Sequence, residues 1–257
     1  MRAGGLKVLI AATLMSLASM ASAAEIRLLS VDAVQNAVRP LAAEFTKETG
    51  HQVTLAVAAP AVVLQKLKAG EVFDAVIVSE AAMDELDRDG RVNPESRVRL
   101  ARTGLGIAVR AGTPVPDVST PEAFTQVLLA ALSIVYGDPG VPHQSGEKIE
   151  RMLAKAGILD TLKPKVRIVA GLVAGQEMIA KGEAAMGLYN ASEIVEARGL
   201  TFAGSVPAPL QVDTSYEGGL LSDGSVPEAA RALIEFLASS DNHPHWSAAR
   251  LEPLGDR

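Results

Sequence analysis

The residues best suited to chemistry lie in one turn, G-D-P-G-V-P-H-Q-S-G-E-K, which begins at Gly137 and ends at Lys148. Ser145 and Lys148 have the S-x-x-K spacing, which places a lysine on the same helix face as a serine and is used by acylating enzymes. His143, Gln144 and Ser145 also offer hydrogen-bond donors beside an expected helix start, where free N–H groups and the helix dipole attract anions. The turn therefore predicts an anion-binding position or, as an alternative, a periplasmic serine hydrolase that uses Ser145 and Lys148.

The other motifs of that alternative are missing from the sequence. A K-T-G partner, a G-x-S-x-G elbow, an H-E-x-x-H pair and a P-loop are all absent. His243 and His245 form an H-x-H pair near the C-terminus, but no carboxylate cluster lies nearby in the sequence, so a solvated turn is the expected reading. We therefore expect no catalytic residue, no metal site and no cofactor. A binding protein is favoured over an enzyme.

The elements around the turn predict how it is positioned. An apolar, partly β-branched run at 132–136 predicts a strand before it. The spacing of Ile149, Met152 and Leu153 predicts a helix after it, with Ser145 as the N-cap. Similar strand–helix alternation recurs along the chain, with expected strands at 25–29, 52–58, 74–79 and 106–110 and an expected loop at 30–33. This alternation predicts an α/β fold with mostly parallel sheets and helices on both faces.

The strand–helix pairs fall into two sets, separated near 102–106 and again near 211–219. This pattern predicts two lobes joined by two crossing strands, with a ligand cleft between the lobes at the carboxyl ends of their strands. The expected division is a first part of lobe 1 at 24–105, lobe 2 at 106–212, and a return to lobe 1 at 213–257.

The N-terminus has the pattern of a secretory signal peptide. Arg2 and Lys7 precede an apolar run at 8–20, which ends in an A-x-A cleavage site at 21–23. We expect cleavage after Ala23 and export to the periplasm. The sequence has no cysteine, which excludes a lipoprotein anchor, a disulfide and thiolate catalysis. The net charge of −6 argues against nucleic acid as a partner, and an aromatic content of 4% argues against a sugar-binding cleft.

Several longer stretches carry a family resemblance: V-Q-N-A-V-R-P-L-A-A-E-F-T-K-E-T-G-H-Q-V, L-Q-K-L-K-A-G-E-V-F-D-A-V-I-V-S-E-A-A-M-D-E-L-D-R-D-G-R-V, Y-G-D-P-G-V-P, and G-E-A-A-M-G-L-Y-N-A-S-E-I-V. With them the chain resembles periplasmic substrate-binding proteins of the molybdate-binding type, which serve ABC importers. The resemblance implies a two-lobed, type II periplasmic binding fold that closes on an oxyanion. It also implies an ABC permease in the inner membrane as the partner, and we expect a monomer. A sensor that presents its ligand to a membrane receptor is an alternative role.

The resemblance also implies ligand-binding positions in the loops that follow the strands. Combined with the turn, these expected binding residues are Ser30, Val31, Ala33, Pro60, Ala61, His143, Gln144, Ser145, Val173 and Asn190. Ala33 and Ala61 stand where the family has serines, and Asn190 stands where it has a tyrosine.

The two missing serine hydroxyls bear on the choice of ligand, because each charge-assisted hydrogen bond contributes about 1.5–3 kcal/mol. We therefore expect an organic di- or tricarboxylate in preference to molybdate. Molybdate, tungstate or another inorganic oxyanion is the alternative. Asp32 would repel an anion if it faced the cleft. Lys66 and Arg102 are candidate counter-charges, or else solvated surface residues.

Overall fold

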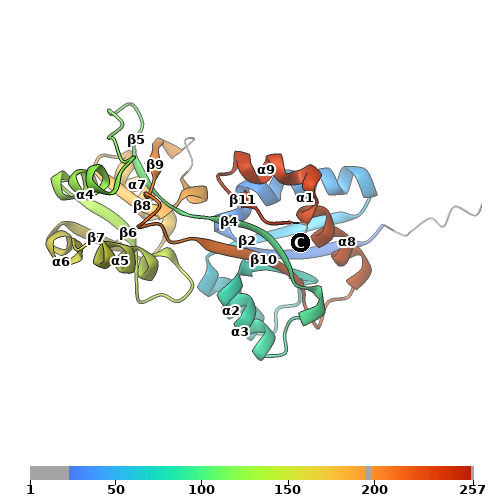
Figure 1. Ribbon diagram of the computed structural model, residues 1–257. Coiled ribbons are helices and arrows are strands. Elements are labelled where there is room, and N and C mark those ends of the chain that lie inside the picture. Colours follow the sequence, from blue (N-terminus) through green and yellow to red (C-terminus); the bar gives the residue numbers. More distant parts are fainter. Residues whose placement is uncertain (1–22, 195–197, 256–257) are drawn as a thin grey trace, which may run out of the picture.

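The computed structural model describes residues 23–194 and 198–255. The predicted signal peptide, apart from Ala23, lies outside the described residues. None of the described helices has the length and apolarity needed to cross a membrane. The described chain forms two lobes, each built on its own sheet, and two extended connections run between them (Figure 1).

The first lobe contains the sheet with strand order β11-β4-β10-β3-β1-β2. Its strands are β1 (Glu25–Val31), β2 (Gln52–Ala58), β3 (Ala75–Ser79), β4 (Val98–Thr103), β10 (Thr214–Leu220) and β11 (Glu252–Pro253). Its helices are α1 (Gln35–Thr49), α2 (Pro60–Lys68), α3 (Glu80–Arg88), α8 (Pro227–Ala238) and α9 (His243–Ala248), with 3-10 turns η1 (Asp32–Val34), η2 (Pro94–Ser96) and η6 (Ser240–Asn242). Apolar faces of α1, α3 and α8 pack on this sheet, and Trp246 of α9 is fully buried in the same core.

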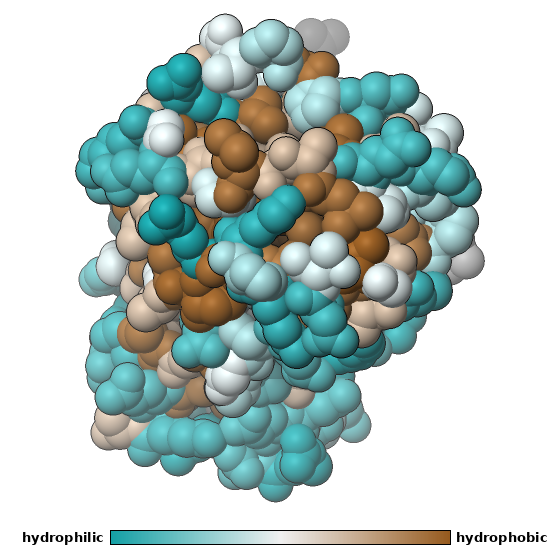
Figure 2. All heavy atoms as spheres, turned by 90° about the vertical axis from the view of Figure 1, so that its left-hand side faces the viewer, coloured by the Kyte–Doolittle hydropathy of each residue, from teal (hydrophilic) through white to brown (hydrophobic). Residues whose placement is uncertain are grey.

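The second lobe contains the sheet with strand order β7-β6-β8-β5-β9. Its strands are β5 (Leu105–Arg110), β6 (Ile134–Gly137), β7 (Val166–Val169), β8 (Met186–Asn190) and β9 (Leu200–Ser205). Its helices are α4 (Pro121–Ala130), α5 (Ser145–Lys155), α6 (Leu159–Leu162) and α7 (Leu172–Ala180), with 3-10 turns η3 (Lys163–Lys165) and η4 (Ala191–Glu193). Figure 2 views the molecule from the side of this lobe and shows apolar surface among hydrophilic side chains. Leu132 and Ile168 are exposed apolar residues of this lobe.

The two-lobed α/β fold is confirmed, but both sheets are mixed where mostly parallel sheets were expected. β1 is parallel to β2 and β3, and β6 is parallel to β7 and β8. The strands that carry the chain between lobes differ: β10 is antiparallel to β3 and β4, and β5 is antiparallel to β8 and β9. The reason is that these strands enter a sheet from the other lobe and are not preceded by a helical crossover of their own.

The change of sheet occurs within one residue, because β4 ends at Thr103 and β5 begins at Leu105. The Gln211 side chain stabilises this point, since its Oε1 accepts a hydrogen bond from the Leu105 N–H at 2.7 Å and its Nε2 donates to the Leu105 carbonyl at 3.0 Å. A Cβ at Gly104 would lie 2.6 Å from the Gln211 amide, so glycine leaves room for that side chain. The β4–β5 connection therefore lies beside the return of the chain to the first lobe (Figure 1).

Candidate ligand-binding site

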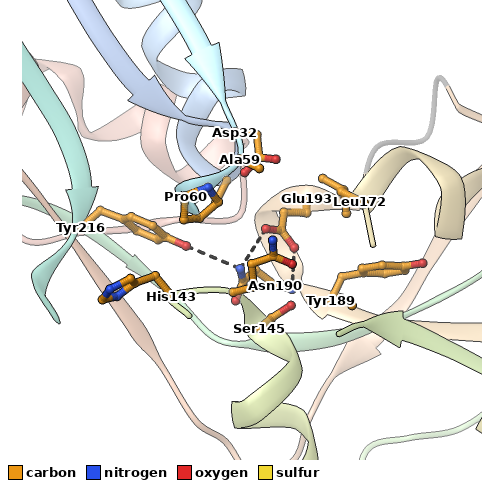
Figure 3. Close-up of a pocket in the computed structure, with 14 residues that line it drawn as sticks. Asp32, Ala59, Pro60, His143, Ser145, Leu172, Tyr189, Asn190, Glu193 and Tyr216 are labelled. Atoms are coloured by element: carbon orange, nitrogen blue, oxygen red, sulfur yellow. Dashed lines mark hydrogen bonds between the residues drawn. The ribbon is translucent and has the colours of Figure 1, made fainter. Parts of the chain in front are cut away.

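A pocket lies between the two lobes, at the ends of strands from both sheets (Figure 3). Ten of the residues that line it are labelled in the figure. The residues that line the pocket are Asp32, Ala33, Ala59, Pro60, Gly137, His143, Gln144, Ser145, Gly171, Leu172, Tyr189, Asn190, Glu193 and Tyr216.

Helix N-termini from both lobes meet at this pocket. Pro60 is the first residue of α2, Ser145 the first residue of α5 and Leu172 the first residue of α7, and all three line the pocket. The opening turns of these helices direct partial positive charge and unpaired N–H groups toward the same space. This arrangement suits an anion with several negatively charged groups.

The turn before α5 places its residues in the pocket. The helix begins at Ser145 with Gln144 in the N-cap position and no side chain capping it, so the prediction of Ser145 as the N-cap was wrong by one residue. Within the described part of the chain the Ser145 hydroxyl has no hydrogen-bond partner, which leaves it available to a ligand. His143 has a positive φ of 62°, and its Nε2 lies 3.0 Å from Glu85 Oε2 of α3. His143 thus connects the turn to the opposite lobe.

Gly146 fixes how closely α5 approaches the end of β6. A Cβ at this position would collide with the Gly137 carbonyl oxygen and lie 2.8 Å from the Asp138 carbonyl carbon, and both are backbone atoms that cannot rotate away.

Gly146→Ala is therefore expected to destabilise the chain by about 1–3 kcal/mol, the usual cost of overpacking. The direction of the change in unfolding free energy is informative, because replacing glycine by alanine inside a helix otherwise stabilises the helix by about 1 kcal/mol. Urea unfolding of the variant and the wild type measures the difference. A variant with unchanged or higher stability would show that α5 does not rest on this backbone.

Two carboxyl groups face the pocket, one from each lobe. Burial raises the pKa of the Asp32 carboxyl to about 6, while the backbone N–H groups of Asp32 and Ala33 and the Arg198 charge act in the opposite direction. Burial, followed by the nearby Asp32 carboxylate, raises the pKa of the Glu193 carboxyl to about 8. At neutral pH the site therefore favours an ionised Asp32 and a protonated Glu193.

Asn190 links Glu193 to the first lobe. Its backbone N–H donates to Glu193 Oε2 at 3.1 Å, and its Nδ2 donates to Glu193 Oε1 at 2.9 Å. The same Nδ2 lies 3.5 Å from the hydroxyl of Tyr216 on β10 (Figure 3). Asn190 and Glu193 form the capping box of η4, in which the Asn190 side chain faces the Glu193 N–H, but no hydrogen bond of good geometry reaches the buried Asn190 Oδ1 from the described residues. It is an acceptor that a ligand could satisfy.

The structure brings some of the expected binding residues together and leaves others out. Those that line the pocket are Ala33, Pro60, His143, Gln144, Ser145 and Asn190. Those absent from the lining are Ser30, Val31, Ala61 and Val173. Ser30 is fully buried because β1 continues to Val31, which corrects the expected loop at 30–33, and the Ser30 hydroxyl donates to the Val31 carbonyl at 3.1 Å.

The candidate counter-charges are not part of the pocket lining. Lys66 pairs with Glu71 at 2.8 Å, and Arg102 pairs with Glu252 at 2.7 Å. Asp32, by contrast, does face the cleft.

The S-x-x-K pair is not assembled for catalysis. Lys148 Nζ lies 2.5 Å from Thr214 Oγ1 and 3.5 Å from the Asp213 carbonyl, on the strand that returns to the first lobe. The lysine is absent from the pocket lining, whereas Ser145 is part of it. The geometry therefore gives the serine hydrolase alternative no nucleophile–base contact.

Several lining residues were not predicted. Glu193 follows Asn190 by three residues at a strand end, the N-x-x-E spacing of a helix start, which could have identified it. Tyr216 lies within β10, and only the pairing of that strand with β3 and β4 brings it to the pocket. No local sequence pattern signals such a position.

Comparison with known proteins agrees with this architecture. The sequence profile of the family described as "Bacterial extracellular solute-binding protein" matches residues 26–249. The chain belongs to this family. A solute-binding relative from Azotobacter vinelandii, the molybdate-binding protein ModA, is 24% identical over 228 residues, which are 86% of this chain and 87% of the relative. The resemblance to molybdate-binding proteins is thus confirmed.

Another relative of this solute-binding protein carries an enzyme name. It is the aconitate isomerase of a Pseudomonas species, 33% identical over 232 residues, which are 88% of this chain and 87% of the relative. Among solved structures, the periplasmic molybdate-binding protein of Azotobacter vinelandii superimposes with a TM-score of 0.73 at 17% identity, covering 90% of this chain and 100% of that one. The solved structure supports the two-lobed fold.

Proposed function

We propose that this solute-binding protein captures a small polycarboxylate, a di- or tricarboxylate, between its two lobes. The observation on which this proposal rests is the combination of helix N-termini with two hydrogen-bond acceptors, Asp32 and Asn190 Oδ1, in one pocket. The helix N-termini suit negatively charged oxygens, whereas Asp32 and Asn190 Oδ1 require a hydrogen-bond donor.

An inorganic oxyanion fits this pocket less well than a polycarboxylate. Molybdate offers only acceptor oxygens at neutral pH, so it would leave the buried Asn190 Oδ1 unpaired, at a cost of about 1–3 kcal/mol. A polycarboxylate that retains one proton, or that carries a hydroxyl, supplies both anionic oxygens and a donor. Ala33 and Pro60 line the pocket without a side-chain hydroxyl, which further disfavours a tetrahedral oxyanion. The relative named for aconitate, a tricarboxylate, supports the same ligand class.

Capture proceeds by closure of the lobes about the crossing strands. Contacts that would break on opening include the one between His143 and Glu85 and the one between Asn190 and Tyr216. We propose that the closed protein acts in the periplasm, as the signal sequence predicts, and delivers its ligand to the permease of an ABC importer.

A thermal-shift screen of the mature chain, from Ala24 onward, tests the ligand class. The panel contains trans-aconitate, citrate and smaller dicarboxylates, with molybdate, tungstate, sulfate and phosphate as comparisons. A ligand at one hundred times its dissociation constant adds about 2.7 kcal/mol of stability, which gives a clear rise in melting temperature. A rise with molybdate and none with any carboxylate would overturn the proposal.

Ser145→Ala is expected to weaken binding of the responding polycarboxylate by about 10-fold or more, because one hydrogen bond to a charged group contributes about 1.5–3 kcal/mol. The apo melting temperature should stay almost unchanged, since the hydroxyl does not cap α5. Isothermal titration and a melting curve measure the two quantities separately. Unchanged affinity with a lowered melting temperature would assign Ser145 a structural role.

The pocket also supports a second function, isomerisation of an unsaturated tricarboxylate such as aconitate. Asp32 and Glu193 favour this function, because proton-transfer enzymes use pairs of buried carboxyl groups whose surroundings hold one ionised and the other protonated. The relative named aconitate isomerase supports it. Incubation with trans-aconitate followed by chromatography for the cis isomer tests it, and stable binding without conversion would leave only the carrier function.

A further inference from the structure

We propose that Asp32 and Glu193 form an acid–base pair, assembled across the cleft when the lobes close, that moves a proton between two carbons of a bound unsaturated polycarboxylate. This inference rests on the isomerisation proposed above and assigns its chemistry to named side chains.

The pair has one member on each lobe. Asp32 opens η1 directly after β1 of the first lobe, and Glu193 ends η4 shortly after β8 of the second lobe. The two 3-10 turns pack against each other, and both carboxyl groups line the same pocket (Figure 3). Further contacts hold the turns together, because Asn36 Nδ2 donates to the Ser192 carbonyl at 3.2 Å. An open protein would separate the pair, so the chemistry is confined to the closed state.

Glu193 is held in one orientation. Both of its carboxyl oxygens accept hydrogen bonds from Asn190, one from the backbone N–H and one from Nδ2. A proton-transfer group needs such a fixed orientation, because its carboxyl oxygen must lie within reach of the carbon that gains or loses the proton.

The surrounding groups leave the pair without a salt bridge inside the pocket. Within the described part of the chain, the lining residues include no lysine or arginine, and the ionisable neighbours there are His143, Tyr189 and Tyr216. Burial raises the pKa of the Asp32 carboxyl, and the Arg198 charge opposes this rise only in part. His143 faces Glu85. Two carboxyl groups in different surroundings therefore hold one proton between them, which provides an acid and a base in a single site.

The step balances without a cofactor. The Asp32 carboxylate takes a proton from the methylene carbon, and the electrons of that C–H bond form the new double bond. The electrons of the old double bond form a C–H bond at the far carbon with the proton from Glu193. The pair still holds one proton, which passes from Asp32 back to Glu193. Helix N-termini at the pocket stabilise the negative charge that develops on the substrate carboxylates.

The test uses the mature chain with trans-aconitate in deuterated water, followed by NMR for deuterium entry and for isomerisation. Glu193→Gln and Asp32→Asn should both retain a thermal shift with trans-aconitate. In each variant the rate of deuterium entry and the rate of isomerisation should fall by at least about 100-fold. Glu177→Gln is the matched control, since it makes the same change on an exposed glutamate of the same lobe that pairs with Lys181, and its rates should equal those of the wild type. The wild-type rate should follow a bell-shaped pH profile with limbs near 6 and 8.

The possible failures are distinguishable. Variants that bind and retain rates within a few-fold of the wild type would overturn the pair and leave isomerisation standing. A wild-type chain that binds trans-aconitate without exchange or isomerisation would overturn the pair and leave the carrier function standing. A chain that binds no polycarboxylate would overturn both proposals.

Discussion

Asp74→Ala is expected to lower the free energy of unfolding by about 3–5 kcal/mol, because the side chain accepts several hydrogen bonds as a buried carboxylate. Asp74 immediately precedes β3 and is 2% exposed. Its Oδ2 accepts the Arg27 N–H at 2.7 Å, and its Oδ1 accepts the Ser225 N–H at 2.7 Å, the Ser225 hydroxyl at 3.0 Å and the Val226 N–H at 3.3 Å. The Asp74 carboxylate thus links β1 to the two residues that precede α8.

The same residue predicts sensitivity to acid. Burial tends to raise the pKa of Asp74, but the donors from Arg27, Ser225 and Val226 outweigh it, so the pKa is lowered in the folded protein. A lowered pKa contributes stability above the unfolded value, and this contribution is lost as the pH falls through the folded value. Urea unfolding at pH 7 and at about pH 2.5, on the acid side of the ordinary aspartate range, should therefore show a larger difference between wild type and variant at pH 7. Asp223→Ala, the same change at an exposed aspartate of the same lobe, is the control. Equal stability of wild type and Asp74→Ala at pH 7 would contradict the role of Asp74.

Glu193→Gln is expected to change how stability depends on pH in the opposite sense. Because the folded pKa of Glu193 is raised to about 8, its contribution is fully present below the unfolded pKa and is lost as the pH rises through about 8. Glutamine cannot ionise and so removes this dependence. Between pH 6 and pH 9 the apo melting temperature of the wild type should fall by about 3 °C or more beyond that of the variant, since 1 kcal/mol corresponds to about 2–4 °C in chains of this size.

Melting curves of the wild type, Glu193→Gln and Glu177→Gln over this range measure the effect. The Glu177→Gln control should behave as the wild type does, because Glu177 is exposed. Parallel curves for the wild type and Glu193→Gln would show that Glu193 is already ionised in the folded protein at pH 6, and so that its pKa is not raised.

Local patterns predicted most of the fold. The run D-A-V-I-V-S predicted β3, which is buried throughout, and the spacing of Ile149, Met152 and Leu153 predicted the buried face of α5. Periodicity of this kind reports which face of an element is buried. Periodicity does not report the direction of a strand that arrives from another lobe. For this reason the sequence predicted mostly parallel sheets, whereas both sheets are mixed.

The site was less predictable, for reasons that differ between residues. The turn at His143, Gln144 and Ser145 was found because glycine, proline and polar residues between a strand and a helix mark a strand end. Ser30 was misplaced because β1 runs two residues further than expected, which places its side chain in the core. Tyr216 reaches the pocket through strand pairing between segments far apart in the sequence, and such long-range contacts leave no local pattern.

Isothermal titration of the mature chain with trans-aconitate, and separately with molybdate, tests the central claim most directly. We predict saturable one-to-one binding of trans-aconitate, no detectable heat with molybdate, and weaker trans-aconitate binding by Ser145→Ala. Tight binding of molybdate with no response to trans-aconitate would contradict the assignment of the cleft to a polycarboxylate.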